Sequence, residues 1–344
     1  MSGTKIISYD IVEQSDVIEF KKTGKYKINR YLGGGSFGEV YQLQKMEENN
    51  PENSKKFALK IFKKYKTEKY PNSENDRPNE ILSLEIKELS TLNIVKRINN
   101  PYLMKYVDWK IHDKTKEIMV LMEHLDFELS TFFYQNLGRN ELINETFFKN
   151  IAFQMLSGLN ALHKNGIIHC DIKPQNILYK PKENIIQIID YGLCQRISFD
   201  INKDYKATGG TYPYMAPDLL LGNTLFFKSL DIWSLGCVLV ELCTGKVIFP
   251  GNHYKEVLEK IVDIFGPIKE LLPGFEFLAQ KRKVTLSERE GKGLITYIKE
   301  NQKFNFLNDD FYDLLNRMLC IDPTKRISAE KAMKHNWFIN SILL

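Results

Sequence analysis

The sequence has few cysteines, and they are not arranged in pairs. Its 344 residues include five cysteines, at positions 170, 194, 237, 243 and 320, and no two of them form a Cys-x-x-Cys pair. The odd number and the wide spacing exclude a disulfide framework and disfavour a zinc site. We therefore expect a protein from a reducing compartment.

Long hydrophobic runs are also absent. No segment reaches the roughly 18 consecutive apolar residues that a membrane span needs, and the most apolar one, residues 234–243, is interrupted by Gly236 and Glu241. The first ten residues lack the apolar run and the small-residue cleavage site of a signal peptide. The expectation is a cytoplasmic or nuclear protein with no membrane partner.

An excess of charge of one sign is missing as well. Lys and Arg together number 48 and Asp and Glu 43, a net charge of +5, and both signs are interspersed along the chain. Such a surface is solvated but lacks the basic stripe of a nucleic-acid-binding protein, so no nucleic-acid partner is expected. The hydrophobic content of 43% is sufficient for a real core.

The first third of the chain is predicted to be rich in β-strands. Four segments of strand length contain many aromatic and β-branched residues between glycine- or asparagine-rich breaks; they span 25–32, 39–44, 56–62 and 117–122. Apolar residues recur every three or four positions from Asn79 to Val95, which predicts one amphipathic helix. The charged residues 63–78 before it predict a surface loop.

After residue 128 the hydrophobic period becomes helical. One helix is predicted around 151–162, ending at Asn165-Gly166, because glycine suits the left-handed turn of a helix end. A second, over 232–242, is too apolar all round to lie at the surface. Two short strands are expected between 167 and 190. The order of elements predicts an α+β fold with a small β-rich lobe and a larger helical lobe.

A glycine-rich segment separates the first two predicted strands. It reads Gly-Gly-Gly-Ser-Phe-Gly-Glu-Val over 33–40 and contains G-x-G-x-x-G. A dinucleotide fingerprint would open a helix, whereas here a strand follows, so we expect the loop to lie over phosphate groups. Lys60 stands among apolar neighbours on the next predicted strand, where an ammonium group is unexpected unless it meets an anion.

The most informative segments follow in a fixed order: His169-Cys170-Asp171, Lys173, Asn176 and Asp190-Tyr191-Gly192. Together with the glycine-rich loop and Ala58-Leu59-Lys60, they resemble the eukaryotic protein kinase family. The resemblance extends over about 25–340. It implies a two-lobed protein-kinase-like fold and transfer of the γ-phosphate of ATP to protein hydroxyl groups.

The resemblance also implies a role for each of these residues. Asp171 is expected to accept the proton of the substrate hydroxyl, Lys173 to steady the transferred phosphoryl group, and Asn176 and Asp190 to hold Mg²⁺. Lys60 is expected to contact the phosphates of ATP. Phosphoryl transfer needs an aligned nucleophile and neutralised phosphate charge, and these residue types supply both.

The nucleotide site that the resemblance implies takes residues from both predicted lobes. The main chain at Glu123 and Leu125 is expected to bond adenine. The other residues expected to hold ATP are Leu32, Gly33, Gly35, Gly38, Val40, Ala58, Lys60, Met122, Glu128 and Leu178.

The glutamate that pairs with Lys60 is open from the sequence alone. The predicted helix carries Glu85 and Glu88, three residues apart and so on neighbouring helix positions. Both fit the family's pattern of a glutamate four residues before a leucine. We prefer Glu88, because it leaves the shorter insertion before Asn100.

Further segments resemble structural parts of the family. Residues 210–218 are similar to the end of an activation segment, with Asp218 in place of the usual glutamate. The resemblance implies a buried ion pair between Asp218 and Arg326, and it implies that Asp231 anchors the catalytic loop. Lys173 and Thr211 resemble the serine/threonine type.

The C-terminal lobe resembles that of the cyclin-dependent and dual-specificity tyrosine-regulated kinase group. Met215 replaces an arginine of that group, so we expect only a weak preference for proline after the acceptor. Cys170 stands where kinases switched by phosphorylation carry arginine, and cysteine cannot bind a phosphate with paired hydrogen bonds. We therefore expect that activity does not require phosphate at Ser198, Tyr205 or Thr208.

The sequence thus predicts a serine/threonine protein kinase that depends on ATP and Mg²⁺. The expected boundaries are an N-terminal extension over 1–24 and a kinase domain over 25–340, divided into an N-lobe (25–122), a hinge (123–127) and a C-lobe (128–340). Expected partners are protein substrates with Ser or Thr acceptors and a regulatory partner of unknown identity. The chain is expected to be a monomer.

Two other functions remain open. A pseudokinase would bind partners without catalysis, although Lys60, Asp171, Asn176 and Asp190 are all present. A small-molecule kinase would share the same catalytic residues, but the segment over 210–218 resembles the peptide-binding platform of protein kinases and disfavours it.

Overall fold

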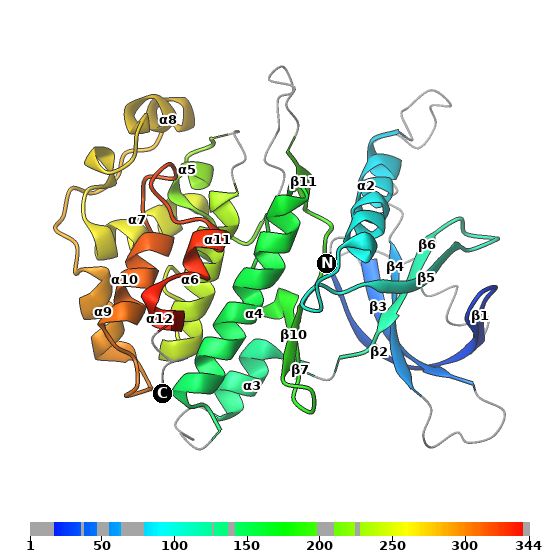
Figure 1. Ribbon diagram of the computed structural model, residues 1–344. Coiled ribbons are helices and arrows are strands. Elements are labelled where there is room, and N and C mark those ends of the chain that lie inside the picture. Colours follow the sequence, from blue (N-terminus) through cyan, green and yellow to red (C-terminus); the bar gives the residue numbers. More distant parts are fainter. Residues whose placement is uncertain are drawn as a thin grey trace, which may run out of the picture. The chain divides into compact units, whose positions relative to one another are not determined.

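The computed structural model describes residues 17–35, 38–46, 55–62, 79–125, 127–136, 142–197, 210–223 and 228–339. The chain divides into two compact units (Figure 1). The first contains the chain up to Asn99 together with Met104–Leu125, and the second contains Asn100–Leu103 and the chain from Asp126 onwards. The predicted fold class is confirmed, since the first unit is built on a β-sheet and the second is mainly helical.

A six-stranded antiparallel sheet forms most of the first unit, with its strands in the order β1-β2-β3-β4-β6-β5. The strands are β1 (Val17–Phe20), β2 (Gly24–Gly35), β3 (Gly38–Lys45), β4 (Lys56–Phe62), β5 (Tyr106–Ile111) and β6 (Ile118–Glu123). The four predicted strands are confirmed as β2, β3, β4 and β6. Strand β1 comes from the expected N-terminal extension and pairs with β2, burying Ile18 and Phe20.

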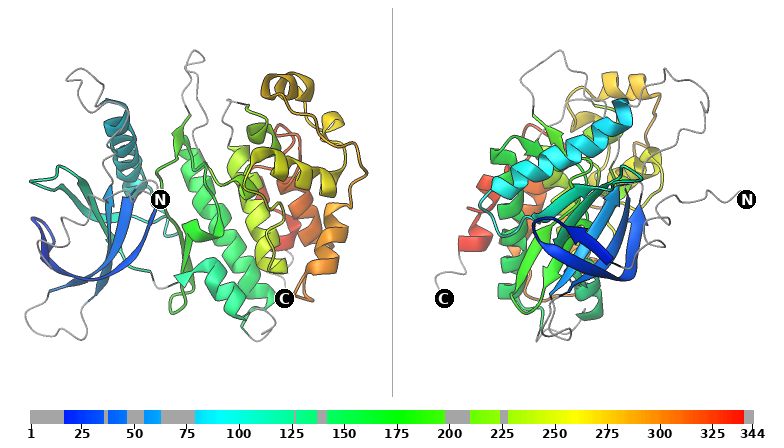
Figure 2. Two further views of the ribbon diagram at one scale, coloured as in Figure 1. Left: turned by 180° about the vertical axis from the view of Figure 1, so that it is seen from behind. Right: turned by 90° about the vertical axis from the view of Figure 1, so that its right-hand side faces the viewer.

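The sheet is curled, so that its two edge strands approach each other (Figure 2). Lys110 on β5 donates from Nζ to the carbonyl oxygen of Glu19 on β1, at 2.7 Å. Inside the sheet, the ring of Tyr26 packs edge-on against Phe20 and Phe57. Aromatic pairs of this geometry stabilise a core beyond the area they bury.

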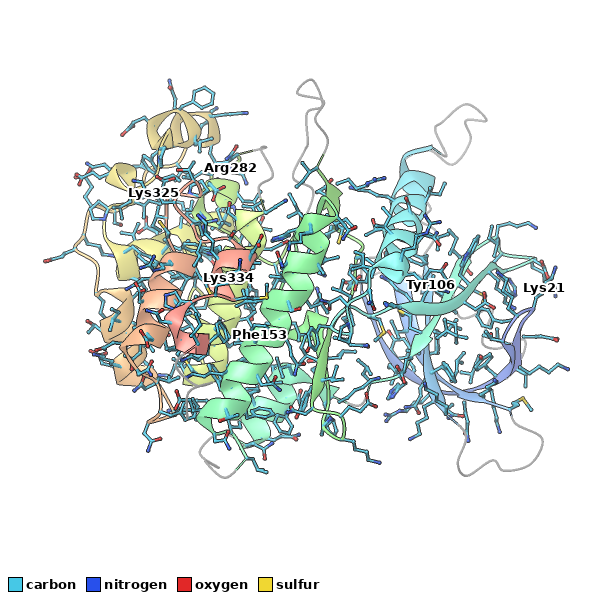
Figure 3. All side chains as sticks on the ribbon, in the orientation of Figure 1. Lys21, Tyr106, Phe153, Arg282, Lys325 and Lys334 are labelled. Atoms are coloured by element: carbon cyan, nitrogen blue, oxygen red, sulfur yellow. The ribbon has the colours of Figure 1, made fainter. Side chains whose placement is uncertain are left out.

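Helix α2 (Asn79–Arg97) is the predicted amphipathic helix. It is fastened to β5 through Tyr106, which is labelled in Figure 3. The Tyr106 hydroxyl donates to Asn93 Oδ1 at 2.7 Å, and the Lys96 ammonium lies 3.9 Å from the centroid of the Tyr106 ring. Because these contacts fix α2 against the sheet, they also fix Glu88. The predicted loop over 63–78 lies outside the described residues.

The second unit is organised around α6 (Ser229–Thr244). Apart from Ser234, every residue of α6 from Leu230 onwards is buried, as the apolar composition predicts. The helices before α6 are α3 (Leu129–Asn136), α4 (Glu145–Lys164) and α5 (Pro217–Leu220), and those after it are α7 (Tyr254–Phe265), α8 (Phe275–Arg282), α9 (Leu294–Asn301), α10 (Asp309–Met318), α11 (Ala329–Ala332) and α12 (Asn336–Ile339). No helix in the described part of the chain is long and apolar enough to cross a membrane.

Short strands lie at the end of α4. This helix stops at Lys164, and Gly166 follows with φ +69°, the left-handed conformation that the Asn-Gly pair predicts. The strands after α4 belong to two small sheets. In one, β9 (Ile177–Lys180) pairs with β10 (Ile185–Ile188) and with β7 (Phe127–Glu128), which precedes α3; in the other, β8 (Ile167–Ile168) pairs with β11 (Gln195–Arg196). The loop between β8 and β9 carries Asp171.

Candidate active site

Three polar side chains surround Asp171 in the second unit. Asp171 Oδ1 accepts a hydrogen bond from Thr211 Oγ1 at 2.8 Å, and Oδ2 accepts from Lys173 Nζ at 2.8 Å and Asn176 Nδ2 at 3.0 Å. Lys173 Nζ also donates to Thr211 Oγ1 at 2.9 Å. Both oxygens of the buried carboxylate are therefore held by donors, and its orientation is fixed.

Asn176 and Asp190 carry the oxygen atoms suited to a metal ion. The Asn176 amide nitrogen donates to both the carboxylate and the carbonyl oxygen of Asp171, which leaves the amide oxygen for a ligand. Oxygen donors are those that Mg²⁺ prefers, and Mg²⁺ usually completes its shell with water and substrate phosphates. Within the described residues no group of three or more His, Cys, Asp or Glu could hold a metal ion by itself. The Asn176 amide oxygen and the Asp190 carboxylate are oxygen donors of the kind that fits Mg²⁺.

His169 connects the Asp171 loop to the segment that carries Asp190. Its Nε2 lies 2.9 Å from the carbonyl oxygen of Ile189 and must donate, because a carbonyl only accepts. Its Nδ1 then accepts from the Asp171 amide at 3.4 Å. The ring of Tyr191 packs edge-on against His169, with centroids 5.7 Å apart. The two segments are thus held in one arrangement.

Asp231 on α6 accepts hydrogen bonds from the loop that carries Asp171, consistent with the anchoring role that the resemblance implies for it. Its Oδ2 accepts from His163 Nε2 at 2.7 Å and from the His169 amide at 2.8 Å, and its Oδ1 accepts from the Cys170 amide at 2.9 Å. Burial alone would raise the pKa of Asp231, but the hydrogen bond and charge of His163 outweigh burial and lower it.

Two residues beside this anchor have left-handed backbone conformations. Cys170 has φ +68° and Asp190 has φ +62°. Residues other than glycine hold such conformations only where the surroundings impose them. For Cys170 the constraint is the hydrogen bond from its amide to Asp231. This strained turn aims the next residue, Asp171, at Thr211.

The first unit contains Lys60 and its partner. Lys60 Nζ on β4 lies 2.7 Å from Glu88 Oε1 on α2, and the two side chains are 12% and 4% exposed. The side chain of Glu85, the alternative partner, lies outside the described residues. The ion pair orients the Lys60 ammonium group, which carries three N–H donors.

The residues predicted to hold the nucleotide are distributed over both units. In the sheet, Val40 pairs with Lys60 and Ala58 with Met122, so these residues lie on adjacent strands. Gly33 and Gly35 pair with Val40 and Gly38 in the β2-β3 hairpin. In the second unit, Glu128 pairs with Leu178. The remaining three residues of the predicted set belong to the first unit; they are Leu32, Glu123 and Leu125.

The predicted ion pair between Asp218 and Arg326 is present but stretched. Arg326 Nη2 lies 3.7 Å from Asp218 Oδ1, and both side chains are buried. The guanidinium donates instead to the carbonyl oxygens of Cys320 and Ser229, each at 2.9 Å. Among the described residues neither carboxylate oxygen of Asp218 forms a hydrogen bond of ordinary length. Burial raises the pKa of Asp218, and the charge of Arg326 offsets this only in part.

Lengthening this side chain is expected to stabilise the protein. In Asp218→Glu the extra methylene brings the carboxylate to hydrogen-bond distance of Arg326, so the free energy of unfolding should rise by about 1–2 kcal/mol. Asp218→Asn is the control and should lower it, since Arg326 then lacks a counter-charge. Urea unfolding of the three proteins measures both changes. A less stable Asp218→Glu variant would contradict this reading of the gap.

Some predicted positions lie outside the described residues, and the sequence analysis did not predict some contacts of the site. Ser198, Tyr205 and Thr208, predicted to be dispensable as phosphate sites, lie outside the described residues. The sequence analysis used Thr211 only as a mark of acceptor type, whereas the structure bonds it to Asp171. It missed His163, although a histidine next to the apolar stripe of α4 is a signal of a buried polar contact.

Comparison with known proteins gives one consistent result. The family model described as "Protein kinase domain" matches residues 26–338. The chain is 28% identical over 329 residues to "Probable cyclin-dependent kinase 8" of Dictyostelium discoideum, covering 91% of this chain and 80% of that protein. It is 30% identical over 319 residues to cyclin-dependent kinase B2-1 of Arabidopsis thaliana, covering 89% and 91%. It is 31% identical over 257 residues to cell division control protein 2 homolog 2 of Trypanosoma brucei brucei, covering 74% and 70%.

Proposed function

Because this chain belongs to the protein kinase family, we propose that it transfers the γ-phosphate of Mg-ATP to serine and threonine hydroxyls of protein substrates. The observation that carries this proposal is the hydrogen-bonded group of Asp171, Lys173, Asn176 and Thr211. Within this group Asp171, Lys173 and Asn176 lie six residues apart or less and offer a carboxylate, an ammonium group and an amide oxygen. Phosphoryl transfer requires these components.

Asp171 has the role of proton acceptor in this proposal. Three donors and the anchored loop fix its carboxylate, so a substrate hydroxyl that reaches Asp171 finds an oriented acceptor. Such orientation reduces the entropy that is lost when the reacting groups reach the transition state. Lys173, bonded to the same carboxylate, places a positive charge where the transferred phosphoryl group develops negative charge.

The proposed kinase domain extends over 25–340, and each unit contains residues with a proposed role in nucleotide binding. Lys60, oriented by Glu88, contacts the phosphates, and the glycine-rich hairpin offers backbone amides to them. Asn176 and Asp190 hold Mg²⁺, which neutralises phosphate charge when bound. The main chain at Glu123 and Leu125 bonds adenine.

The relatives named as cyclin-dependent kinases lead us to extend the proposal to regulation. A cyclin-like protein is the proposed regulatory partner of an otherwise monomeric chain, which acts in the cytoplasm or the nucleus. The resemblance of the C-terminal lobe to that kinase group supports this.

The acceptor preference is tested with a peptide library. The contact between Lys173 and Thr211 supports a platform for serine and threonine, so the purified chain should phosphorylate Ser and Thr far more than Tyr, with only weak dependence on a following proline. Mass spectrometry of the products measures the distribution of acceptors. Mainly tyrosine products would refute the proposed specificity.

A further inference from the structure

One buried carboxylate on α6 accepts hydrogen bonds from two tyrosines. Tyr214 donates from its hydroxyl to Glu241 Oε2 at 2.6 Å, and Tyr134 on α3 donates to Glu241 Oε1. Glu241 is 2% exposed. Its two oxygens thus connect α3 to the segment that follows Thr211.

Both tyrosines are held as neutral donors. Burial and the neighbouring Glu241 raise the pKa of Tyr214, and burial and the hydrogen bond to Glu241 raise the pKa of Tyr134. A neutral hydroxyl that donates to a carboxylate forms a charge-assisted bond, which is stronger than one between neutral groups. Each tyrosine therefore limits the movement of the other through Glu241.

Tyr214 belongs to the same turn as Thr211. Its amide donates to the Thr211 carbonyl oxygen at 2.9 Å, and its own carbonyl accepts from Ser234 Oγ at 2.7 Å. Since Thr211 is bonded to Asp171, a shift of Tyr214 displaces the turn next to the proton acceptor.

The ring of Tyr134 contributes little to the core. Tyr134 is 42% exposed, yet its hydroxyl reaches inward to Glu241. A side chain that only filled space would bury its ring and leave the polar end in water. The orientation indicates that the hydroxyl is the functional part of Tyr134.

We propose that Tyr134 is a positioning residue for the peptide substrate, holding Glu241 and thereby the Thr211–Tyr214 turn on which the acceptor peptide rests. The proposal rests on the proposed kinase function, and it deepens that function by linking α3 to peptide binding. Tyr134 is not a catalytic residue in this proposal, because it acts only through Glu241 and Tyr214.

Removal of the two hydroxyls, singly and together, tests the proposal kinetically. Tyr134→Phe should raise the KM for a Ser/Thr peptide about fivefold, less than the full value of a hydrogen bond to a charged group, because Tyr134 acts on the peptide only through Glu241 and Tyr214. The KM for ATP should not change. The melting temperature should fall, because Glu241 Oε1 stays buried without this donor. In a Tyr214→Phe background the same substitution should add little, because the contact through which it acts is already broken.

The matched control is Tyr312→Phe. Tyr312 on α10 donates to Gln302 Oε1 at 2.8 Å, so this variant loses a tyrosine hydrogen bond, to a neutral acceptor, outside the Glu241 group. It should leave the KM for the peptide unchanged. An unchanged KM in Tyr134→Phe, or a full additive effect in the double variant, would overturn the proposal.

Amide hydrogen exchange gives a readout that does not depend on activity. In Tyr134→Phe, amides of Tyr214 and Met215, which close the turn on Thr211 and Tyr212, should exchange faster, whereas Tyr312→Phe should not affect them. If the wild type transfers no phosphate, the proposed function fails, and exchange alone decides whether Tyr134 holds this turn. Unchanged exchange at both amides would also overturn the inference.

Discussion

Replacement of Asp171 by asparagine is expected to abolish peptide phosphorylation while Mg-ATP still binds. The amide has nearly the same shape, so it can still accept from Thr211 through its oxygen, but it cannot take the proton of the substrate hydroxyl. Loss of a general base lowers the rate by about 10²–10⁴-fold. The expected result is a kcat reduced by that factor.

Nucleotide binding and a matched variant serve as controls for Asp171→Asn. The affinity for Mg-ATP, measured by calorimetry, should stay within about twofold, because kcat falls alone when the lost interaction exists only in the transition state. Asp263 lies on α7 and pairs with Arg289; Asp263→Asn is the matched control and should retain full activity. Comparable turnover in Asp171→Asn would remove Asp171 from the mechanism.

Replacement of Asp231 by alanine is expected to cause the largest loss of stability. The carboxylate is 1% exposed and accepts three hydrogen bonds, from His163 and from the amides of His169 and Cys170. Without it, these donors stay buried and unpaired. Breaking a buried charged pair costs about 3–5 kcal/mol, so urea unfolding should show a decrease of that size, and the strained turn at Cys170 should relax with loss of kcat.

The pH dependence of the unfolding free energy tests whether the Asp231 carboxylate causes this loss of stability. Because the folded pKa of Asp231 lies below its ordinary value of 3.8, its contribution is complete above that value and is lost as the pH falls through the folded pKa. The difference between wild type and Asp231→Ala should therefore narrow only below pH 3.8. Asp263→Ala, which removes a surface pair, should cost less than about 1 kcal/mol. Equal losses in the two variants would contradict a buried anchor.

Local sequence patterns predict much of the fold. Three such patterns depend on neighbouring residues alone: the aromatic and β-branched content of 25–32 and 56–62, the amphipathic period from Asn79, and the all-round apolar segment that forms α6. Strands β1 and β5 were missed; both are edge strands of the sheet, and β1 has only four residues. Val107, Trp109 and Ile111 of β5 are partly exposed, so the usual contrast between polar and apolar faces is lost.

The candidate site was predictable where its residues are close in sequence. Asp171, Lys173 and Asn176 lie within six positions, and the fixed order of motifs identifies them. The contacts of His163 and Tyr134 were not predictable, because their partners Asp231 and Glu241 lie 68 and 107 residues away. The long distance between Asp218 and Arg326 results from a side chain that is one methylene shorter than glutamate. A motif predicts which residues pair but not the distance between them.

Phosphate transfer by the purified chain tests the central claim most directly. The measurement is a single-turnover assay with labelled Mg-ATP and a peptide identified from the library, made alongside nucleotide binding in the same preparation and repeated with Asp171→Asn. We expect label on peptide Ser or Thr with the wild type and almost none with the variant, at equal nucleotide binding. Binding of Mg-ATP without transfer by the wild type, with a cyclin-like partner supplied, would contradict the account and leave a protein that binds nucleotide without catalysis.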